Sequence, residues 1–371
     1  MNEAYFLNSS LFEEARLQIK ATMDLATQQH LDIFGQTWYD KHFTHSEFPR
    51  SVNEFTAILE EVHAAPAAST INEYSERPIR SLDGFGKIKA EMLTVAHTYK
   101  LEDEDLAGIS NAQRLYKGQQ LLDYVVNKLM NVRSKAIQGI RNRQDMLILT
   151  LLSNDGKYTF TNENDPGSPY IGQTLDFGFD ATHAASANTP WTEANKSTVN
   201  VLEDIMSIYQ SATIKPTKML MEPERLFYIL STDKAKLYVN GSDRASRPIS
   251  KTDLDNLLAQ YGLPAIELVQ REIRIDANGG KTVSMVDPWK KGQILFVPED
   301  NFGTIERKLT AAEDGRPSPG VEYAYYNGIE VANWTQGLRE NTNYTEFVSA
   351  ALTSTPVVEN IRNMYSLDTK A

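Results

Sequence analysis

The feature that most constrains the fold is a long helical pattern between Ala112 and Leu152. A helix of roughly 40 residues at about 1.5 Å each is a rod of about 60 Å, longer than a compact domain of this size requires. The sequence Asn154-Asp155-Gly156 then supplies turn chemistry. The prediction is one long helix over 112–152, carried by apolar residues at near-helical spacing: Leu115, Leu122, Val125, Leu129, Val132, Ala136, Ile140 and Leu147.

Residues 1–45 are predicted to contain a helical arm. Ser9 and Ser10 are suitable N-caps. One helical face then collects the apolar residues Leu11, Phe12, Ala15, Ile19, Met23 and Ala26. Such a helix either packs in the core of its own chain or packs on a neighbouring subunit, and the pattern leaves both open.

A hairpin is predicted ahead of the long helix. Residues 71–80 and 87–101 read as extended runs, and the sequence SLDGFG at 81–86 reads as the turn. The second run is polar and charged along much of its length, and an isolated two-stranded ribbon is marginal in water. The hairpin is therefore expected to pack against a surface outside its own domain.

The rest of the chain reads as mixed helices and strands. Short strands and loops over 157–191 precede an amphipathic helix over 197–212, a helix from Pro223 and a helix over 253–261. DANGGK at 276–281 is a tight-turn sequence between two strands, and the chain closes with strand-like runs. The order is α+β, not regular βαβ.

Composition excludes several classes of protein. The 371 residues contain no cysteine, which excludes disulfides, thiolate zinc sites and cysteine nucleophiles. No apolar run approaches the length of a membrane span, and the start lacks the pattern of a signal peptide. The net charge of −12 comes without a strongly basic block, unlike a specific nucleic-acid binder.

Three partial motifs stand in the order of a protein kinase: Asp83-Gly84-Phe85-Gly86, Asp176-Phe177-Gly178 and Glu222-Pro223-Glu224. The other parts that a kinase needs fail on spacing and order. Asp176-Phe177-Gly178 matches the metal-holding DFG, yet the third position of the glycine loop that starts at Gly84 is Lys89. The nearest match to the catalytic His-Arg-Asp is His30-Leu31-Asp32, which precedes the glycine loop. Phosphoryl transfer needs all of these parts, so a phosphotransferase is disfavoured.

No other catalytic or metal motif survives. Gly280-Lys281-Thr282 ends like a P-loop but precedes an apparent strand, whereas a P-loop feeds a helix. His42 and His45 lack a ligand partner at typical spacing, and no serine lies in a GxSxG setting. We therefore expect no catalytic residue, cofactor or metal.

The segment QTLDFGFD is interpreted as a strand. Leu175, Phe177 and Phe179 alternate with polar residues, and their side is expected to pack inward. Gly178 would mark a bulge or a close backbone approach, and Asp176 would need a hydrogen-bond or salt-bridge partner. Both are taken as structural residues, together with Trp191.

Five stretches stand out by their order and spacing along the chain. These are NRQDMLILTLLSNDGKYTF; LDFGFD with PWTEANKSTVNVLEDIMSIY; KPTKMLMEPERLFYILSTDKAKLYV; DPWKKGQILFVPEDNFGTIERKL; and ANWTQGLRENTNYTEFVSAALTSTPVVEN. With them the chain resembles, over nearly its whole length, tailed-phage major capsid proteins of the Hong Kong 97-like fold, in the lambda-type capsid protein E group.

The resemblance implies five segments. They are an N-terminal arm and junction (1–66), an extended-loop β-hairpin (67–100), a peripheral domain with the spine helix (101–194), an axial domain (195–335) and a C-terminal return (336–371). Assembly contacts are expected from the hairpin residues Arg80, Asp83, Gly84, Phe85, Gly86, Lys87 and Lys89.

The resemblance also implies a role and partners. The chain would be a structural, non-enzymatic protein that forms hexamers and pentamers of an icosahedral shell around double-stranded DNA, with only non-specific DNA contact and no membrane. A portal, a scaffold and a decoration protein are the implied partners, and assembly would occur in the host cytoplasm. A cellular nanocompartment shell of the same fold is the alternative.

Overall fold

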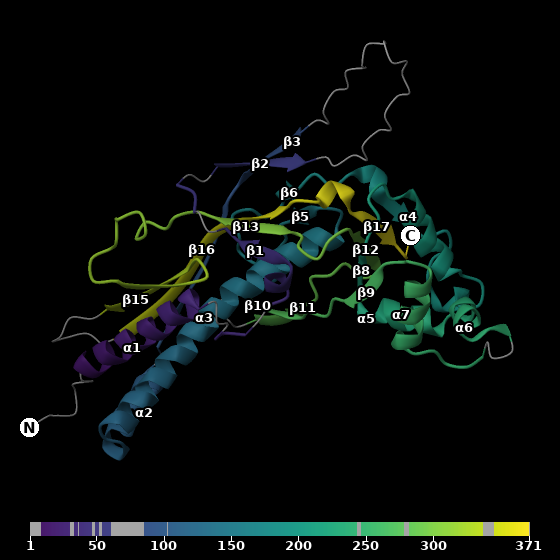
Figure 1. The fold of residues 1–371 in the computed structure, drawn as a ribbon. Helices are drawn as coiled ribbons and strands as arrows, with labels where there is room; N and C mark the ends of the chain where they lie inside the picture. The colour runs from purple at the N-terminus through teal and green to yellow at the C-terminus, as the bar shows by residue number, and fades with distance from the viewer. Residues whose placement is uncertain are drawn as a thin grey trace, which may run out of the picture. The chain divides into compact units, whose positions relative to one another are not determined.

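The computed structural model describes residues 9–29, 33–35, 37–46, 49–51, 54–60, 85–101, 103–242, 246–277, 282–336 and 345–370. Figure 1 shows the ribbon coloured by residue number. The chain divides into two compact units. Unit 1 comprises Met1–Phe55, Ala90–Asp145 and Thr304–Pro356, and unit 2 comprises Thr56–Lys89, Met146–Gly303 and Val357–Ala371. These units do not coincide with the five segments expected from the sequence, whose roles stay predictions.

The helices of unit 1 are α1 (Ser9–Gln28), α2 (Asp103–Leu115) and the first part of α3 (Gln119–Ser153). The predicted arm helix is confirmed, and the stripe formed by Ala15, Ile19, Met23 and Ala26 is buried. The boundary between the two units falls between Asp145 and Met146, inside α3. At about 1.5 Å per residue, the 35 residues of α3 span about 52 Å.

The prediction of one uninterrupted helix over 112–152 is wrong at its start. The chain leaves the helix after Leu115 and re-enters it at Gln119. Gly118 has φ +57, a left-handed conformation that glycine adopts without a steric penalty and that ends a helix. Leu115, expected in the buried stripe, is instead 77% exposed.

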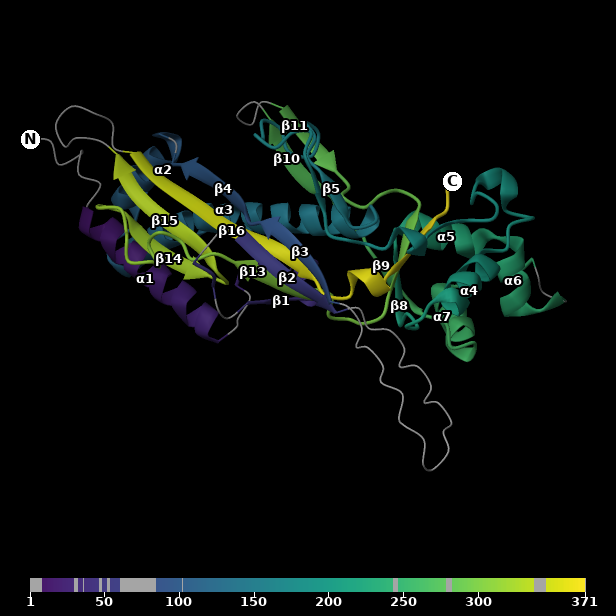
Figure 2. The ribbon, with the colours of Figure 1, turned by 90° about the horizontal axis from the view of Figure 1, so that it is seen from above.

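Most of unit 1's remaining structure is a six-stranded sheet with the strand order β1-β13-β16-β15-β14, in which β4 also pairs with β16. Figure 2 shows β14, β15, β16 and β4 side by side. Asn327-Gly328, both at positive φ, form the turn between β14 and β15. The strands are β1 (Phe43–His45), β4 (Leu93–Lys100), β13 (Gly303–Arg307), β14 (Glu322–Tyr326), β15 (Ile329–Gln336) and β16 (Thr345–Val358).

The core of unit 1 lies between this sheet and the helices α1 and α3. The sheet contributes Tyr326, Val331 and Val348, and α3 contributes Val125 and Leu129. Burying such side chains is the main favourable term in folding. Of the predicted stripe on the long helix, Leu122, Val125, Leu129, Ala136, Ile140 and Leu147 are buried, whereas Val132 is half-buried.

Charged groups also lie inside unit 1. Arg133 of α3 is buried, and burial lowers the pKa of its guanidinium to about 10, so it stays charged at neutral pH. Arg16 of α1 lies 3.6 Å from the buried Glu346 of β16 and 3.1 Å from Glu322 of β14. Because a buried ion pair is costly to break, these contacts fix how α1 lies on the sheet.

A carboxylate clamp holds the segment that follows the arm. Asp145 of α3 accepts a hydrogen bond of 2.9 Å from the backbone N–H of Tyr39. Asp40 accepts hydrogen bonds from Thr37 and from Arg141, and it lies 3.5 Å from His45. Burial raises the pKa of Asp40, but the bonds from His45 and Thr37 and the charge of Arg141 outweigh it, so the pKa lies well below its usual range.

The hairpin expected over 71–101 differs from the observed pairing. Strand β3 (Phe85–Glu91) pairs with β2 (Glu54–Glu60), a segment for which the sequence analysis predicted no strand, and β4 joins the large sheet through β16. Phe85 and Gly86 therefore lie in a strand and not in the predicted turn. The predicted strand over 71–80 and residues 81–84 lie outside the described residues.

Unit 2 carries the helices α4 (Val201–Ser211), α5 (Pro223–Ser231), α6 (Asp233–Asn240) and α7 (Lys251–Gln260). Three of them follow the sequence prediction. Val201, Ile205 and Ile208 form the buried face of α4. Gly262, at φ +67, follows the end of α7 as expected, and Ser250 and Asp253 form a capping box at its start.

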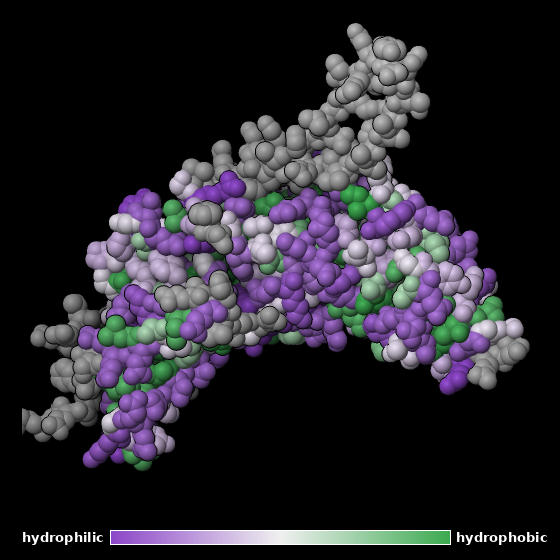
Figure 3. Space-filling view, viewed as in Figure 1, coloured by the Kyte–Doolittle hydropathy of each residue, from purple (hydrophilic) through white to green (hydrophobic). Residues whose placement is uncertain are grey.

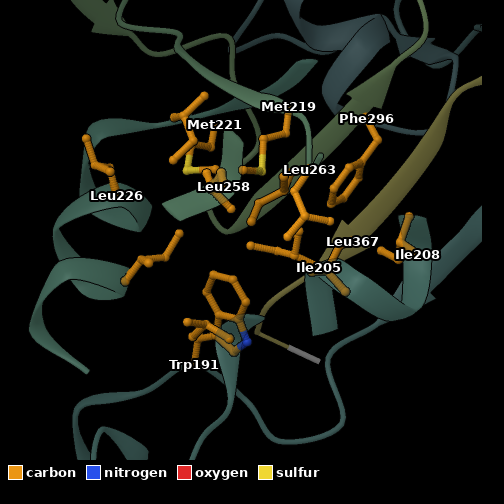
Figure 4. Close-up of a cluster of buried hydrophobic side chains, with 14 of the residues drawn as sticks. Trp191, Ile205, Ile208, Met219, Met221, Leu226, Leu258, Leu263, Phe296 and Leu367 are labelled. Carbon is orange, nitrogen blue, oxygen red and sulfur yellow. The ribbon is translucent and has the colours of Figure 1, made fainter. Parts of the chain in front are cut away.

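These helices accompany a five-stranded sheet with the order β7-β17-β12-β8-β9. The C-terminal strand β17 lies between β7 and β12, so the end of the chain is an interior part of the sheet. Figure 4 shows the core that results, with Met219 and Phe296 from the sheet facing Ile205 and Leu258 from the helices. The strands are β7 (Ala184–Ser186), β8 (Lys218–Met221), β9 (Ala265–Leu268), β12 (Gln293–Val297) and β17 (Tyr365–Asp368).

Unit 2 also contains two antiparallel ribbons. Strand β5 (Lys157–Thr159) pairs with β6 (Thr174–Asp176), and β10 (Ile273–Ala277) pairs with β11 (Thr282–Val286). The second ribbon confirms the predicted hairpin around DANGGK. Because a strand follows Gly280-Lys281, the structure agrees with the rejection of a P-loop.

Candidate assembly surface

Trp191 contacts two helices of unit 2, α4 and α5, and holds them in place. Its side chain is buried, and Nε1 donates a hydrogen bond of 2.9 Å to Oδ2 of Asp204 in α4. Asn188 donates to the other carboxylate oxygen at 3.0 Å. The indole ring stacks on Tyr228 of α5, with ring centroids 5.9 Å apart. Trp191 thus ties α4 and α5 to the loop before α4.

Arg225 of α5 extends this network to the C-terminal strand. Its Nη1 donates to the carbonyl oxygen of Trp191 at 3.1 Å and to Oγ1 of Thr369 at 3.3 Å. Its Nε lies 3.3 Å from Glu222, a buried carboxylate that accepts a hydrogen bond of 2.8 Å from the N–H of Gly292. Because charge-assisted bonds are strong, α5 is held rigidly against the sheet.

Large apolar side chains are exposed on α5, on α6 and directly after α7. Phe227 of α5 is 69% exposed, and Tyr261, which follows α7, is 60% exposed. Leu237 and Tyr238 of α6 are exposed as well. Figure 3 shows hydrophobic residues at the surface over the region of α5, α6 and α7. Exposed apolar patches of this kind mark interaction sites.

A groove of about 430 Å³ opens between α4, α6 and α7. Its walls are apolar, and Glu203 is the one charged residue among the described residues that line it. Asn200 at its edge donates a hydrogen bond of 3.0 Å to Glu203 and lies 3.5 Å from the hydroxyl of Tyr238. Such a groove suits an apolar side chain. The apolar lining residues are Leu202, Met206, Tyr238, Leu257, Leu258, Tyr261 and Leu263.

Asp176 has protein partners. It ends strand β6, its Oδ1 accepts a hydrogen bond of 2.9 Å from the N–H of Gly178, and Lys157 lies 4.0 Å away. Gly178 has φ +79, which glycine tolerates. Phe177 is buried as expected, but Leu175 and Phe179 are only half-buried, because the strand ends at Asp176 instead of continuing.

The predicted hairpin residues are only partly within the described structure. Phe85, Gly86, Lys87 and Lys89 lie on strand β3. Arg80, Asp83 and Gly84 lie outside the described residues. Across the described ranges, no group of three or more His, Cys, Asp or Glu side chains could hold a metal ion. In the same ranges no helix is long and apolar enough to cross a membrane.

A family model for phage major capsid protein E matches residues 53–318. The chain belongs to the phage major capsid protein E family. It is therefore a structural protein of a phage capsid, and its place is the shell of the virion, which is built from many copies. Family membership and the mixed helix and sheet architecture agree with the Hong Kong 97-like fold expected from the sequence.

Solved structures similar to this capsid protein include a candidate prophage capsid protein, a phage capsid and an encapsulin. A candidate capsid protein of a prophage of Escherichia coli CFT073 is 13% identical, with a TM-score of 0.49, 76% of this chain covered and 79% of that chain covered. The capsid of Myoviridae phage XM1 is 12% identical, with a TM-score of 0.43 and coverage of 91% and 94%. The SrpI encapsulin of Synechococcus elongatus PCC 7942 is 10% identical, with a TM-score of 0.35 and coverage of 91% and 91%. No curated protein matches this sequence.

Sequence reasoning missed the groove and Phe227. The sequence places Tyr261 at the end of a predicted helix, but it does not indicate that α4, α6 and α7 converge. The exposure of Phe227 could have been predicted from the sequence around it. In the run Leu226-Phe227-Tyr228-Ile229, a helix cannot bury every side chain against one face, so one large apolar residue must point outward.

Proposed function

We propose that this capsid protein forms hexamers and pentamers that close into an icosahedral shell around the double-stranded DNA of a tailed phage. The family match over residues 53–318 is the observation that carries the proposal. Exposed apolar side chains on α5 and α6 support it, because a shell built from one chain must cover such surfaces with further copies. Ring-shaped capsomers require contacts between two different patches of the same molecule.

The DNA is an enclosed cargo in this proposal. The net charge of −12 disfavours tight binding to phosphates, so contact with the genome is non-specific. A portal, a scaffold and a decoration protein are the further partners, and the shell assembles in the host cytoplasm. No role as an enzyme is part of the proposal.

The segment around β2 and β3 is proposed to reach a neighbouring subunit. The two strands form a ribbon of their own, and a two-stranded ribbon gains stability by packing on other surfaces. The proposed contacts are Lys87 and Lys89 on β3, together with Arg80, Asp83, Gly84, Phe85 and Gly86. Deleting residues 81–84 is expected to leave a folded chain that does not assemble. A chain that unfolds instead would show that this segment stabilises its own unit.

Sedimentation of the purified chain over a range of salt concentrations tests the proposal. Rapidly sedimenting closed particles are expected, and a monomer under every condition would contradict it. The content of particles made in a phage-producing host separates the two kinds of shell. Nuclease-protected double-stranded DNA is expected for a phage capsid, and an enzyme cargo without DNA would favour the nanocompartment.

A further inference from the structure

We propose that Phe227 of one copy inserts into the groove between α4, α6 and α7 of the next copy in a ring. This inference rests on the proposed function and assigns a contact to it. Both surfaces belong to unit 2. The contact therefore needs no assumption about how the two units of one chain are placed.

Phe227 has the properties of an anchor residue. It is the most exposed aromatic side chain among the described residues, while its neighbours Leu226, Tyr228 and Ile229 are buried. The helix that carries it is fixed by the bonds of Arg225 to Trp191 and Thr369. An aromatic side chain on a rigid element loses little freedom when it is buried, which is typical of residues that dominate interfaces.

The groove has the properties of the receiving site. Its walls are formed by Leu202, Met206, Leu257 and Leu263, and the exposed rings of Tyr238 and Tyr261 contribute to its lining. Aromatic rings prefer offset or edge-to-face contact with other rings, which these two tyrosines offer to an incoming phenylalanine. Apart from Glu203, no described lining residue is charged. An apolar occupant is therefore more favourable than a charged one, because burying a charge among apolar side chains is costly.

The occupant is a second copy and not the same molecule. No described residue of α5 lines the groove, so the anchor and the groove are separate patches of one unit. Two different complementary patches produce a head-to-tail contact, and such a contact closes into a ring when the rotation permits. A capsid shell supplies many neighbouring copies of the same chain.

The absence of cysteine makes a direct test possible. A double variant, Phe227→Cys with Tyr261→Cys, changes two exposed positions on the two proposed surfaces. Particles are assembled under reducing conditions, oxidised, and analysed on a denaturing gel without reductant. The expected result is a ladder of covalently linked chains up to five and six, which each single variant lacks. Val283→Cys, paired with Phe227→Cys, is the control, because Val283 is exposed but lies on β11 away from the groove lining.

The outcomes separate this inference from the proposed function. Particles that form but give only single chains, or a bridge within one chain, overturn the insertion of Phe227 and leave the shell intact. Failure of the unmodified chain to form particles contradicts the proposed function itself. If the double variant does not assemble, Phe227→Asp decides. It should lower the assembled fraction at least about tenfold, as for a dominant interface residue, without changing the melting temperature of the unassembled chain. Assembly of Phe227→Asp at the unmodified level would overturn the inference.

Discussion

The contact between α3 and β4 offers a quantitative test of the packing in unit 1. His97 of β4 lies against the helix, and its Nε2 is 2.7 Å from the carbonyl oxygen of Ala136. This approach is possible because position 139 is a glycine. A Cβ added there would lie 2.6 Å from Nε2 of His97 and closer still to Cε1.

The expected energies follow from three terms. Gly139→Ala overpacks the contact, which typically costs about 1–3 kcal/mol. It also displaces the hydrogen bond of His97, worth about 1 kcal/mol. The better helix propensity of alanine stabilises the folded chain by about 1 kcal/mol and offsets part of this loss. The net expectation is a loss of about 1–3 kcal/mol for Gly139→Ala, since the last two terms roughly cancel.

Removing the histidine should remove most of this penalty. His97→Ala alone loses the hydrogen bond, at about 1 kcal/mol. The double variant loses the same bond but keeps the gain in helix propensity, so its stability should lie within about 1 kcal/mol of the original. The two substitutions are therefore expected to be strongly non-additive.

Urea unfolding of the unassembled chain, followed by circular dichroism, measures these differences. Gly108→Ala in α2 is the matched control, because the nearest atom to its added Cβ is the hydroxyl of Tyr124 at an ordinary 3.6 Å. That control should be neutral or stabilising. Simple additivity of Gly139→Ala and His97→Ala would refute the proposed contact.

Three further predictions test other parts of the fold. Gly303→Ala should destabilise the chain by more than about 1 kcal/mol in thermal unfolding. The added Cβ would meet the Val357 carbonyl, and the φ of Gly303 is +151. An unchanged melting temperature would contradict this prediction. Trp191→Phe should cost about 1–3 kcal/mol in urea unfolding, because it removes a bond to the buried Asp204, and a loss well below 1 kcal/mol would show that this bond is unimportant. The lowered pKa of Asp40 means that its contribution to stability is complete above about pH 4 and is lost as the pH falls toward its folded value. Asp40→Asn should thus flatten the decline of the unfolding midpoint below about pH 4, and an unchanged decline would place its origin elsewhere.

Local patterns predicted much of the fold. The apolar stripe of α1, the buried face of α4 and the pairing of β10 with β11 all depend on residues close in sequence. The break at Gly118 was missed because the surroundings of a glycine, and not its residue type alone, decide its conformation. The pairing of β3 with β2 was missed because it joins two segments that are far apart in the sequence.

The candidate surface was less accessible from the sequence than the fold. Trp191 was identified as structural, but its partner Asp204 lies on a helix whose own pattern gives no reason to expect a buried carboxylate. The groove needs three helices to converge, which is a property of tertiary packing. The sequence predicted that Asp176 needs a partner, but only the structure identifies Gly178 and Lys157 as its partners.

Cryo-electron microscopy of assembled particles should show a closed icosahedral shell whose hexamers and pentamers are built from this chain. The side chain of Phe227 in each copy should lie in the groove of its neighbour. Particles without capsomer rings, or a purified chain that remains monomeric under all assembly conditions, would contradict the proposed capsid assembly.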